Sequence, residues 1–379
     1  PLEIAEKPHM NYLAKHGTAG MAKTVPDDLP AGSDTANLSV MGYNPHKYYS
    51  GRSPLEAASM GIDLKLTDVT YRCNLVTLSE AENLASAQMI DYSAGEITTA
   101  EAKELVDYMN DILHDETRNL YAGVSYRHCL VVHNMTTGVT ATPPHDITGK
   151  PVKEYLPHEG YGAQLLQMME KSYTLLKDHP VNQARIAKGL NPANCLWFWG
   201  EGTKPDLTSF KELYDVDGAV ISAVDLLKGI GICAGLEAPE IEGATGNINT
   251  NYENKVKKAL EILQDKDFVY IHIEAPDECG HQRNAKEKKR AIELLDSRIV
   301  GPVLEAMQKS GEDFSIMIAP DHPTPVAIGT HTHEPVPYII YRSNEAGEAP
   351  LENYCEREAA EKGIYVAEGF TLMSKLLQK

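Results

Sequence analysis

The chain has 379 residues, of which 42% are hydrophobic, and its formal net charge is −19. This length is enough for about two to three domains with well-buried cores, so we expect a globular protein. The acidic balance excludes proteins that hold nucleic-acid phosphates through basic patches. Because no apolar run approaches the roughly 20 residues of a membrane-spanning helix, we predict a cytoplasmic protein with neither a membrane nor a nucleic acid as partner.

The six cysteines are scattered along the chain without a C-x-x-C pair. This spacing predicts neither a disulfide framework nor a structural zinc site. We therefore expect reduced and mostly buried thiols at Cys73, Cys129, Cys195, Cys233, Cys279 and Cys355.

In the N-terminal segment, residues 1–17 show apolar side chains at helical spacing, and Gly17 is placed to end the helix. A short strand is expected next. Gly32-Ser33-Asp34 then precedes an apolar run, which places Ser33 at a helix start. Either Ser33 or Asp34 can serve as a helix cap. The same position puts the Ser33 hydroxyl beside unpaired N–H groups at the positive end of the helix dipole, which favour an incoming phosphate.

From residue 51 the pattern changes to alternating strands and amphipathic helices, which predicts an inserted, smaller α+β domain over residues 51–205. A strand-then-helix pattern from residue 218 indicates a return to the first sheet, so the first domain is discontinuous, over 1–50 and 206–379. In the insert we predict strands at 72–77, 126–133 and 195–200, and helices at 98–113 and 161–176; beyond it, we predict helices at 251–263 and 286–307.

Polar side chains gather in residues 314–338, where an apolar run ends at a proline and is followed by Asp321, His322, His331 and His333. An apolar run of this length suits a buried parallel strand, and the carboxyl ends of such strands carry the functional groups of α/β proteins. An Asp-His pair can also simply cap a turn. From spacing alone, His331 and His333 are equal candidates for a metal ligand.

A second apolar run, residues 267–275, is followed by Asp277 and His281. Side chains four residues apart point to a common centre if the segment makes a helical turn. His272 lies inside the predicted strand and is more typical of a core histidine. Two runs that each lead to an Asp and a His predict a metal centre. Mixed carboxylate and imidazole ligands favour manganese or zinc, and two metals about 4 Å apart suit phosphoryl transfer.

These motifs resemble the cofactor-independent phosphoglycerate mutases of the archaeal type, within the alkaline phosphatase superfamily. The resemblance covers nearly the whole chain and rests on residues 32–42, 276–281, 320–325 and 331–337. It implies an alkaline-phosphatase-like α/β fold with a mixed, mainly parallel sheet flanked by helices. The implied activity is the interconversion of 3-phosphoglycerate and 2-phosphoglycerate in glycolysis and gluconeogenesis, on a small phosphorylated three-carbon acid, by a protein that can be a homo-oligomer.

The resemblance also implies residue roles. Ser33 becomes the phosphorylated nucleophile. The ligands of one metal are Asp277, His281 and His331; those of the other are Ser33, Asp321 and His322. His331 is thus favoured over His333, and the metals are expected to be manganese, with zinc or cobalt also suitable and no nucleotide. In the insert, the residues expected to bind the substrate are Arg72, Arg127, His145 and Asp146, with His145 and Asp146 also as acid or base; Arg52 and Lys228 are weaker candidates.

The sequence departs from the family at its start. The family begins with a strand whose Asp-Gly supplies a further ligand of the second metal, ahead of the segment that corresponds to residues 1–4. We expect a truncated sequence, because loss of a central strand would leave a hole in the core. A degenerate second site, as in a binding protein that is not an enzyme, is the competing interpretation.

Two further enzyme classes are compatible with the metal motifs. One is a homoserine kinase-type phosphotransferase, although no G-x-x-x-x-G-K-[ST] loop occurs in the sequence. The second is another metal-dependent phosphomutase or phosphatase, which would share the motifs and differ in the inserted domain.

Overall fold

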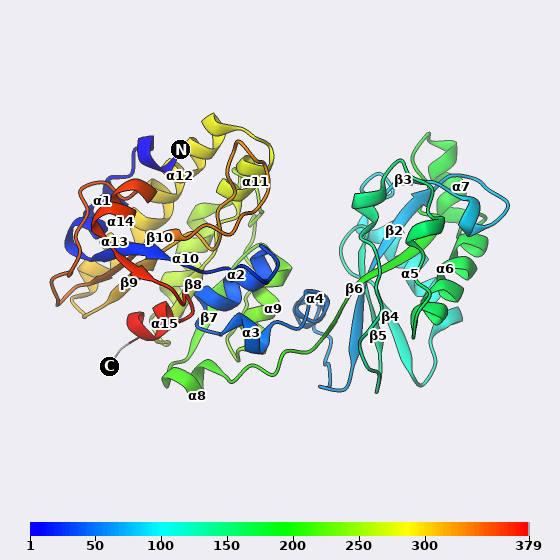
Figure 1. The fold of residues 1–379 in the computed structure, drawn as a ribbon, viewed down its shortest axis with the longest axis horizontal. Helices are drawn as coiled ribbons and strands as arrows, with labels where there is room; N and C mark the ends of the chain where they lie inside the picture. The colour runs from blue at the N-terminus through cyan, green and yellow to red at the C-terminus, as the bar shows by residue number, and fades with distance from the viewer. Residues whose placement is uncertain (378–379) are drawn as a thin grey trace. The chain divides into compact units, whose positions relative to one another are not determined.

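The computed structural model describes residues 1–377, which form two compact units (Figure 1). Unit 1 comprises Pro1–Tyr49 and the chain from Asp206 onward, and unit 2 comprises Ser50–Pro205. Unit 1 holds the motifs at Ser33, Asp277 and Asp321, whereas unit 2 holds the arginines predicted to bind the substrate. No helix within the described part of the chain has the length and apolar character needed to cross a bilayer.

Unit 1 contains a mixed sheet of four strands in the order β11-β1-β10-β9. Strand β1 pairs parallel with β11 and antiparallel with β10, which in turn pairs antiparallel with β9. A separate parallel pair is formed by β7 and β8. The strands span Thr18–Ala22 (β1), Gly218–Ile221 (β7), Phe268–Ile271 (β8), Ser315–Ile318 (β9), Val336–Arg342 (β10) and Ile364–Val366 (β11).

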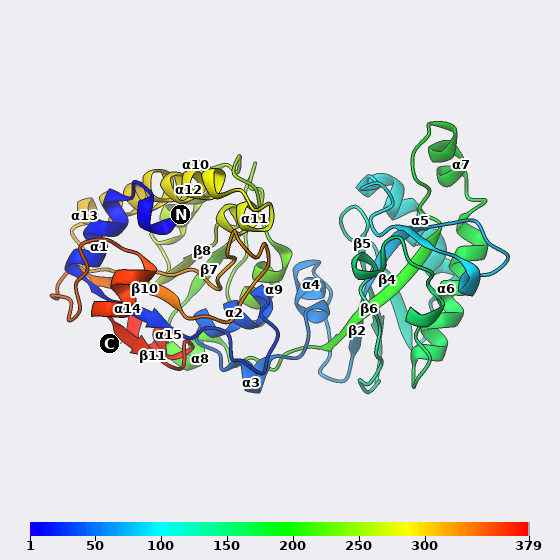
Figure 2. The ribbon, with the colours of Figure 1, turned by 45° about the horizontal axis from the view of Figure 1, so that its top comes forward.

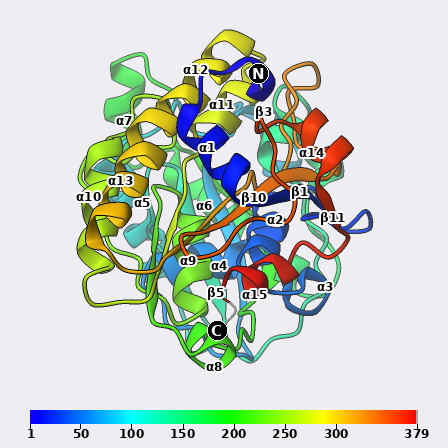
Figure 3. The same cartoon turned by 90° about the vertical axis from the view of Figure 1, so that its left-hand side faces the viewer.

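Helices cover both faces of the four-stranded sheet. Ile339 and Tyr341 of β10 pack on the side of helices α1, α12 and α13, which lie together in Figures 2 and 3. Tyr338 and Ile340 of the same strand pack on the opposite side against α15. This alternation follows from the two-residue repeat of a strand. The helices of unit 1 are α1 (Pro8–His16), α2 (Ser33–Val40), α3 (Pro45–Tyr48), α8 (Phe210–Tyr214), α9 (Asp225–Cys233), α10 (Tyr252–Ile262), α11 (Ala275–His281), α12 (Ala285–Leu295), α13 (Gly301–Ser310), α14 (Glu356–Lys362) and α15 (Thr371–Leu376), with a 3₁₀ turn at Leu2–Ile4 and a π turn at Asp296–Val300.

Strands β8 and β9 each have one edge without a strand partner among the described residues. A cavity of about 1480 Å³ extends along both strands and is lined by Val269, Ile271, Ile316 and Ile318. The strand edges offer backbone hydrogen-bonding groups, and the lining is largely apolar. The space between β8 and β9 therefore suits an additional strand.

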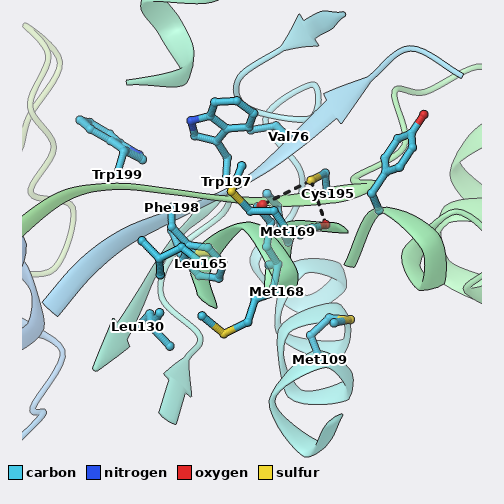
Figure 4. Packing of buried hydrophobic residues seen from close by; sticks show 14 of the residues in the cluster. Val76, Met109, Leu130, Leu165, Met168, Met169, Cys195, Trp197, Phe198 and Trp199 are labelled. Atoms are coloured by element: carbon cyan, nitrogen blue, oxygen red, sulfur yellow. Dashed lines mark hydrogen bonds between the residues drawn. The ribbon is translucent and has the colours of Figure 1, made fainter. Parts of the chain in front are cut away.

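Unit 2 is an antiparallel sheet with helices on both faces: α5 and α6 lie on the side of Leu130 and Val132, and α4 lies on the side of Cys129 and Val131. Its longest strand, β2, pairs with β3, β5 and β6, and β4 pairs with β5. Figure 4 shows Met168 and Met169 of α6 against Trp197 and Phe198 of β6 in its core. The strands span Val69–Leu78 (β2), Met89–Asp91 (β3), Arg118–Tyr121 (β4), Arg127–Val132 (β5) and Cys195–Thr203 (β6); the helices are α4 (Ser53–Ser59), α5 (Thr99–Leu113), α6 (Gly162–Leu176) and α7 (Pro180–Ala187), with 3₁₀ turns at Leu84–Ser86, Pro144–Ile147 and Lys153–Tyr155.

The predicted helices and strands of unit 2 are confirmed, with Thr98 capping α5 through a capping box with Glu101. In unit 1 four details of the prediction are wrong. The first helix begins only at Pro8, because a proline is tolerated at a helix start and not within it. The helical run 286–307 contains the π turn, β9 pairs antiparallel instead of parallel, and β8 ends at Ile271, before His272. The predicted α/β class with its mixed sheet is confirmed. Five of the six thiols are buried; Cys233 is half-buried.

Candidate functional site

Ser33 is the first residue of α2, and the preceding Gly32 occupies the cap position without a side-chain hydrogen bond. The Ser33 hydroxyl is therefore not used as a helix cap. Its Oγ lies 2.9 Å from Nε2 of His322, which belongs to the segment after β9. The neighbouring Asp34 accepts a hydrogen bond from the backbone N–H of Thr35. The helix start thus leaves Ser33 free to face the histidine.

Asp277 and His281 both lie on α11, one helical turn apart, and the distance between Asp277 Oδ2 and His281 Nε2 is 3.1 Å. Pro276 is tolerated here because it occupies the first turn of the helix. Gly280 brings this helix close to the segment after β9, since a Cβ at Gly280 would lie 2.6 Å from the carbonyl oxygen of Thr324. The local sequence therefore sets both the spacing of the two polar side chains and the close approach of the second segment.

His331 completes a group of three with Asp277 and His281. Its Nε2 lies 3.0 Å from His281 Nε2 and 3.3 Å from Asp277 Oδ1. The Nδ1 of His281 lies 3.1 Å from the carbonyl oxygen of Gly329, and that of His331 lies 2.9 Å from the carbonyl oxygen of Ala31. A carbonyl can only accept, so both Nδ1 atoms carry the hydrogen and both Nε2 atoms present lone pairs.

This donor set fits a divalent cation. One carboxylate oxygen and two imidazole nitrogens lie within 4.8 Å of one another. Three acceptors that converge in this way repel one another unless a cation or a proton lies among them. The carbonyl partners of the two Nδ1 atoms are the usual supports of metal-binding histidines.

The interactions in this group shift the pKa values of both Asp277 and His331. Burial opposes ionisation of Asp277, but a hydrogen bond from Nε2 of the protonated form of His331 and one from Thr324 hold the pKa of the carboxyl well below its usual range. Burial likewise opposes protonation of His331, yet its hydrogen bond to Asp277 raises the pKa of the imidazole overall. The carboxylate is therefore ionised at neutral pH and available to a cation.

Asp321, His322 and Ser33 form a second group. His322 Nε2 lies 3.4 Å from Asp321 Oδ2 as well as 2.9 Å from Ser33 Oγ. The Thr324 hydroxyl joins the two groups, because it contacts Nδ1 of His322 at 3.3 Å and also hydrogen-bonds Asp277. His322 is almost fully buried, which keeps water from separating these contacts.

Two histidines of the motifs lie outside both groups. His333 directs its Nε2 to the carbonyl oxygen of Leu29 at 2.9 Å. His272 is buried between Ser222, 3.1 Å from its Nδ1, and Glu274, 3.2 Å from its Nε2, and burial lowers its pKa to about 4. His272 therefore has the contacts of a neutral core histidine.

Unit 2 holds a cluster of arginines and aromatic rings. Glu56 accepts hydrogen bonds from Nε of both Arg52 and Arg72, each at 2.8 Å. The guanidinium of Arg72 stacks on Trp199, 4.0 Å from the ring centre, and the Trp199 N–H donates to Asn74. Arg72 is thus held on two sides while the NH1 and NH2 groups of its fork have no hydrogen-bond partner among the described residues.

The other predicted residues of unit 2 surround the same rings. His145 packs edge-on against Trp199 at 5.4 Å and against Tyr92 at 6.0 Å, and its Nε2 lies 3.7 Å from Asp146. Arg127 lies over Tyr126, which contacts Tyr92. Sequence patterns do not single out Glu56 or Trp199, because neither lies in a recognisable motif.

Lys228 and His128 are both buried and lie outside the arginine cluster. Lys228 is buried on α9 and pairs with Glu240 at 2.6 Å, within unit 1. His128, which follows Arg127 in the sequence, is buried in the core of unit 2, where burial lowers its pKa to about 3. Its Nδ1 accepts from the backbone N–H of Gly123, and it is not part of the arginine cluster.

Residues 14–182 match the family model of the 2,3-bisphosphoglycerate-independent phosphoglycerate mutases. The chain is 49% identical to the enzyme of that name from Methanosarcina barkeri, over 96% of the chain and 89% of the relative. The chain belongs to this family. It is also 47% identical, over 100% of its length and 94% of the relative, to a probable member from Geobacter sulfurreducens.

Two solved structures share the fold of this chain. A Pyrococcus horikoshii protein superposes with a TM-score of 0.81 at 32% identity, covering 100% of this chain and 91% of that protein. A cofactor-independent phosphoglycerate mutase from Thermoplasma acidophilum superposes with a TM-score of 0.68 at 24% identity. The superposition covers 100% of this chain and 93% of that protein and shows the same fold. The predicted family and enzyme class, an isomerase, are therefore confirmed.

Proposed function

We propose that the chain interconverts 3-phosphoglycerate and 2-phosphoglycerate through a phosphoserine at Ser33. The observation that carries this proposal is the position of the Ser33 hydroxyl, at the first residue of α2 and 2.9 Å from His322, beside two converging groups of carboxylate and imidazole. The names of the relatives supply the substrate class. Family membership makes a kinase the less favoured candidate.

We assign two divalent metals to these groups. Asp277, His281 and His331 would hold one, and Ser33, Asp321 and His322 the other. Bound cations would supply positive charge that lowers the barrier to phosphoryl transfer. Manganese is the metal we expect, because imidazole and carboxylate ligands together suit it better than magnesium or calcium.

The proposed reaction has two balanced steps. Ser33 Oγ forms a bond to phosphorus as the bond to the 3-hydroxyl oxygen of the substrate breaks; the serine proton leaves and the glycerate oxygen gains one. In the second step the 2-hydroxyl oxygen of the glycerate forms a bond to phosphorus and loses its proton as the bond from phosphorus to Ser33 Oγ breaks, and Oγ regains a proton. His145 and Asp146 are our candidates for moving the protons of the two substrate hydroxyls, the usual task of such groups.

We further propose that unit 2 binds the anionic groups of the acid. The free edge of the Arg72 fork can bind a carboxylate or phosphate with two parallel hydrogen bonds. Arg127 adds a second cation over Tyr126. We place the reaction in glycolysis and gluconeogenesis in the cytoplasm, in keeping with its substrate.

The decisive experiment replaces Ser33 with Ala and follows 3-phosphoglycerate and 2-phosphoglycerate by NMR with added manganese. We expect no turnover, and no phosphorylated protein in the intact mass spectrum, whereas the wild-type chain gives both. Ser39→Ala is the matched control, since Ser39 is buried on the same helix. Full turnover by Ser33→Ala would refute the nucleophile.

A further inference from the structure

One buried side chain, Asn37, links Ser33 to Asp321. Asn37 lies on α2 one turn after Ser33 and is 0% exposed. Its Nδ2 donates to the carbonyl oxygen of Ser33 at 2.8 Å and to Oδ2 of Asp321 at 2.7 Å. Both hydrogens of the amide are thus used, one on each of two residues of the second group.

The amide oxygen of Asn37 faces a third segment. The Tyr270 hydroxyl, from β8, donates to Asn37 Oδ1 at 2.6 Å. Together with the two bonds from Nδ2, this bond holds the amide in one orientation. If the amide were flipped, its oxygen would face the Asp321 carboxylate, and two acceptors would then meet without a hydrogen. The Tyr270 hydroxyl thus supplies the buried Oδ1 with its donor and holds the amide in the orientation that presents Nδ2 to Asp321.

The remaining contacts of Asp321 are one with the next residue and one with the segment after β1. Its Oδ1 accepts from the backbone N–H of His322 at 2.9 Å, and its carbonyl oxygen accepts from the Thr24 hydroxyl at 2.6 Å. The amide of Asn37 is the side-chain donor on Oδ2, the oxygen nearest His322 Nε2. The direction of this carboxylate thus depends on Asn37.

We propose that Tyr270 and Asn37 are positioning residues: Tyr270 orients the Asn37 amide, which holds the Asp321 carboxylate in place beside Ser33 and His322 for a divalent cation. This inference rests on the proposed function, because it assigns a cation to that group. Supports of this kind affect metal affinity by about 10-fold to 100-fold when removed. Replacing Tyr270 with Phe removes only the hydroxyl that donates to Asn37 and keeps the ring.

The test measures cation affinity, independently of turnover. The full chain is stripped with a chelator and titrated with Mn²⁺, and free Mn²⁺ is followed by electron paramagnetic resonance. We expect Tyr270→Phe to weaken binding at one site by about tenfold. Tyr252→Phe is the matched control, because Tyr252 is a buried tyrosine of unit 1 whose hydroxyl donates to the carbonyl of Ile248. It should bind Mn²⁺ like the wild type.

Asn37→Leu provides a second variant, which removes the donor and carries the test if Tyr270→Phe does not fold. The double variant separates a relay from two independent effects. If Tyr270 acts through Asn37, adding Tyr270→Phe to Asn37→Leu weakens binding no further. Additive losses, or wild-type affinity in both single variants, would overturn the inference. A wild-type chain that binds no Mn²⁺ would overturn the proposed metal function as well, which distinguishes the two failures.

Discussion

The Nε2 atoms of His281 and His331 lie 3.0 Å apart, and each ring is held by a hydrogen bond from Nδ1 to a backbone carbonyl. These carbonyls fix the tautomer, so two lone pairs face each other across a short distance. Such a pair is stable when it shares a cation with the adjacent Asp277 carboxylate. The arrangement distinguishes His331 from His333, which is bonded to Leu29.

His331→Ala should therefore weaken Mn²⁺ binding by more than about tenfold, since loss of a supporting partner alone costs that much. His333→Ala, two residues away, should retain wild-type affinity because its imidazole lies outside both groups. Titration of the metal-free chain by calorimetry checks both variants. A larger loss in His333→Ala than in His331→Ala would contradict the assignment.

Replacing Arg72 with Lys keeps the charge but removes the planar fork and the Nε donor to Glu56. We expect KM for 3-phosphoglycerate to rise by about tenfold or more, because hydrogen bonds between charged groups contribute about 1.5–3 kcal/mol. The effect on kcat should be smaller, since the lost contact serves binding. Steady-state kinetics measures both parameters.

Arg118→Lys is the control for this experiment, because Arg118 also lies in unit 2 but pairs with Asp115 outside the aromatic cluster. It should leave KM unchanged. An unaltered KM in Arg72→Lys would remove Arg72 from the binding residues.

Because His128 is buried, we predict that the stability of unit 2 decreases in acid. Its pKa falls from the ordinary 6.5 to about 3 because burial disfavours the imidazolium. The unfolded state thus binds more protons between these values, so stability is full above pH 6.5 and declines as the pH falls toward 3. At pH 5 the loss is about 2 kcal/mol, from about 1.4 kcal/mol for each pH unit below 6.5.

Urea unfolding at pH 7 and pH 5 tests this, with tryptophan fluorescence as the probe, since both tryptophans of the chain lie in unit 2. His128→Leu should flatten the pH dependence even if it lowers stability at pH 7. His158→Leu, at an exposed histidine of the same unit, should leave the dependence intact. Equal dependence in wild type and His128→Leu would be the contrary result.

Asp296, in the π turn, anchors the start of α1. Its carboxylate is 0% exposed and accepts from the backbone N–H groups of Met10 at 2.7 Å and His9 at 3.3 Å. Asp296→Ala leaves these donors buried without a partner and should cost about 2–3 kcal/mol in the free energy of unfolding. Asp296→Asn keeps one acceptor and should cost less.

Circular dichroism of urea unfolding gives these free energies. The exposed Glu312, on the turn after α13, offers a control, and Glu312→Ala should change stability by no more than about 0.5 kcal/mol. If Asp296→Ala were as stable as Glu312→Ala, the capping role would be wrong.

Local pattern specifies much of this molecule without any tertiary contact. The four-residue spacing of Asp277 and His281 predicts a common direction on one helical turn, and α11 supplies that turn. Thr98 and Glu101 likewise predict the start of α5. Such features depend on hydrogen bonds within a few residues, so neighbouring side chains suffice to specify them.

The contacts between residues far apart in the sequence could be identified only from the folded chain. The Ser33 hydroxyl meets His322 across 289 residues, and His331 is oriented by the carbonyl of Ala31, 300 residues away. No spacing rule connects such partners, because strand order and the path of each loop decide which segments meet. The same holds for the Tyr270–Asn37 pair and for Glu56, whose neighbours come from separate elements. Local sequence thus specifies which residue types follow each strand, whereas the folded chain selects those that share a centre, because strand order and loop paths decide which distant segments meet.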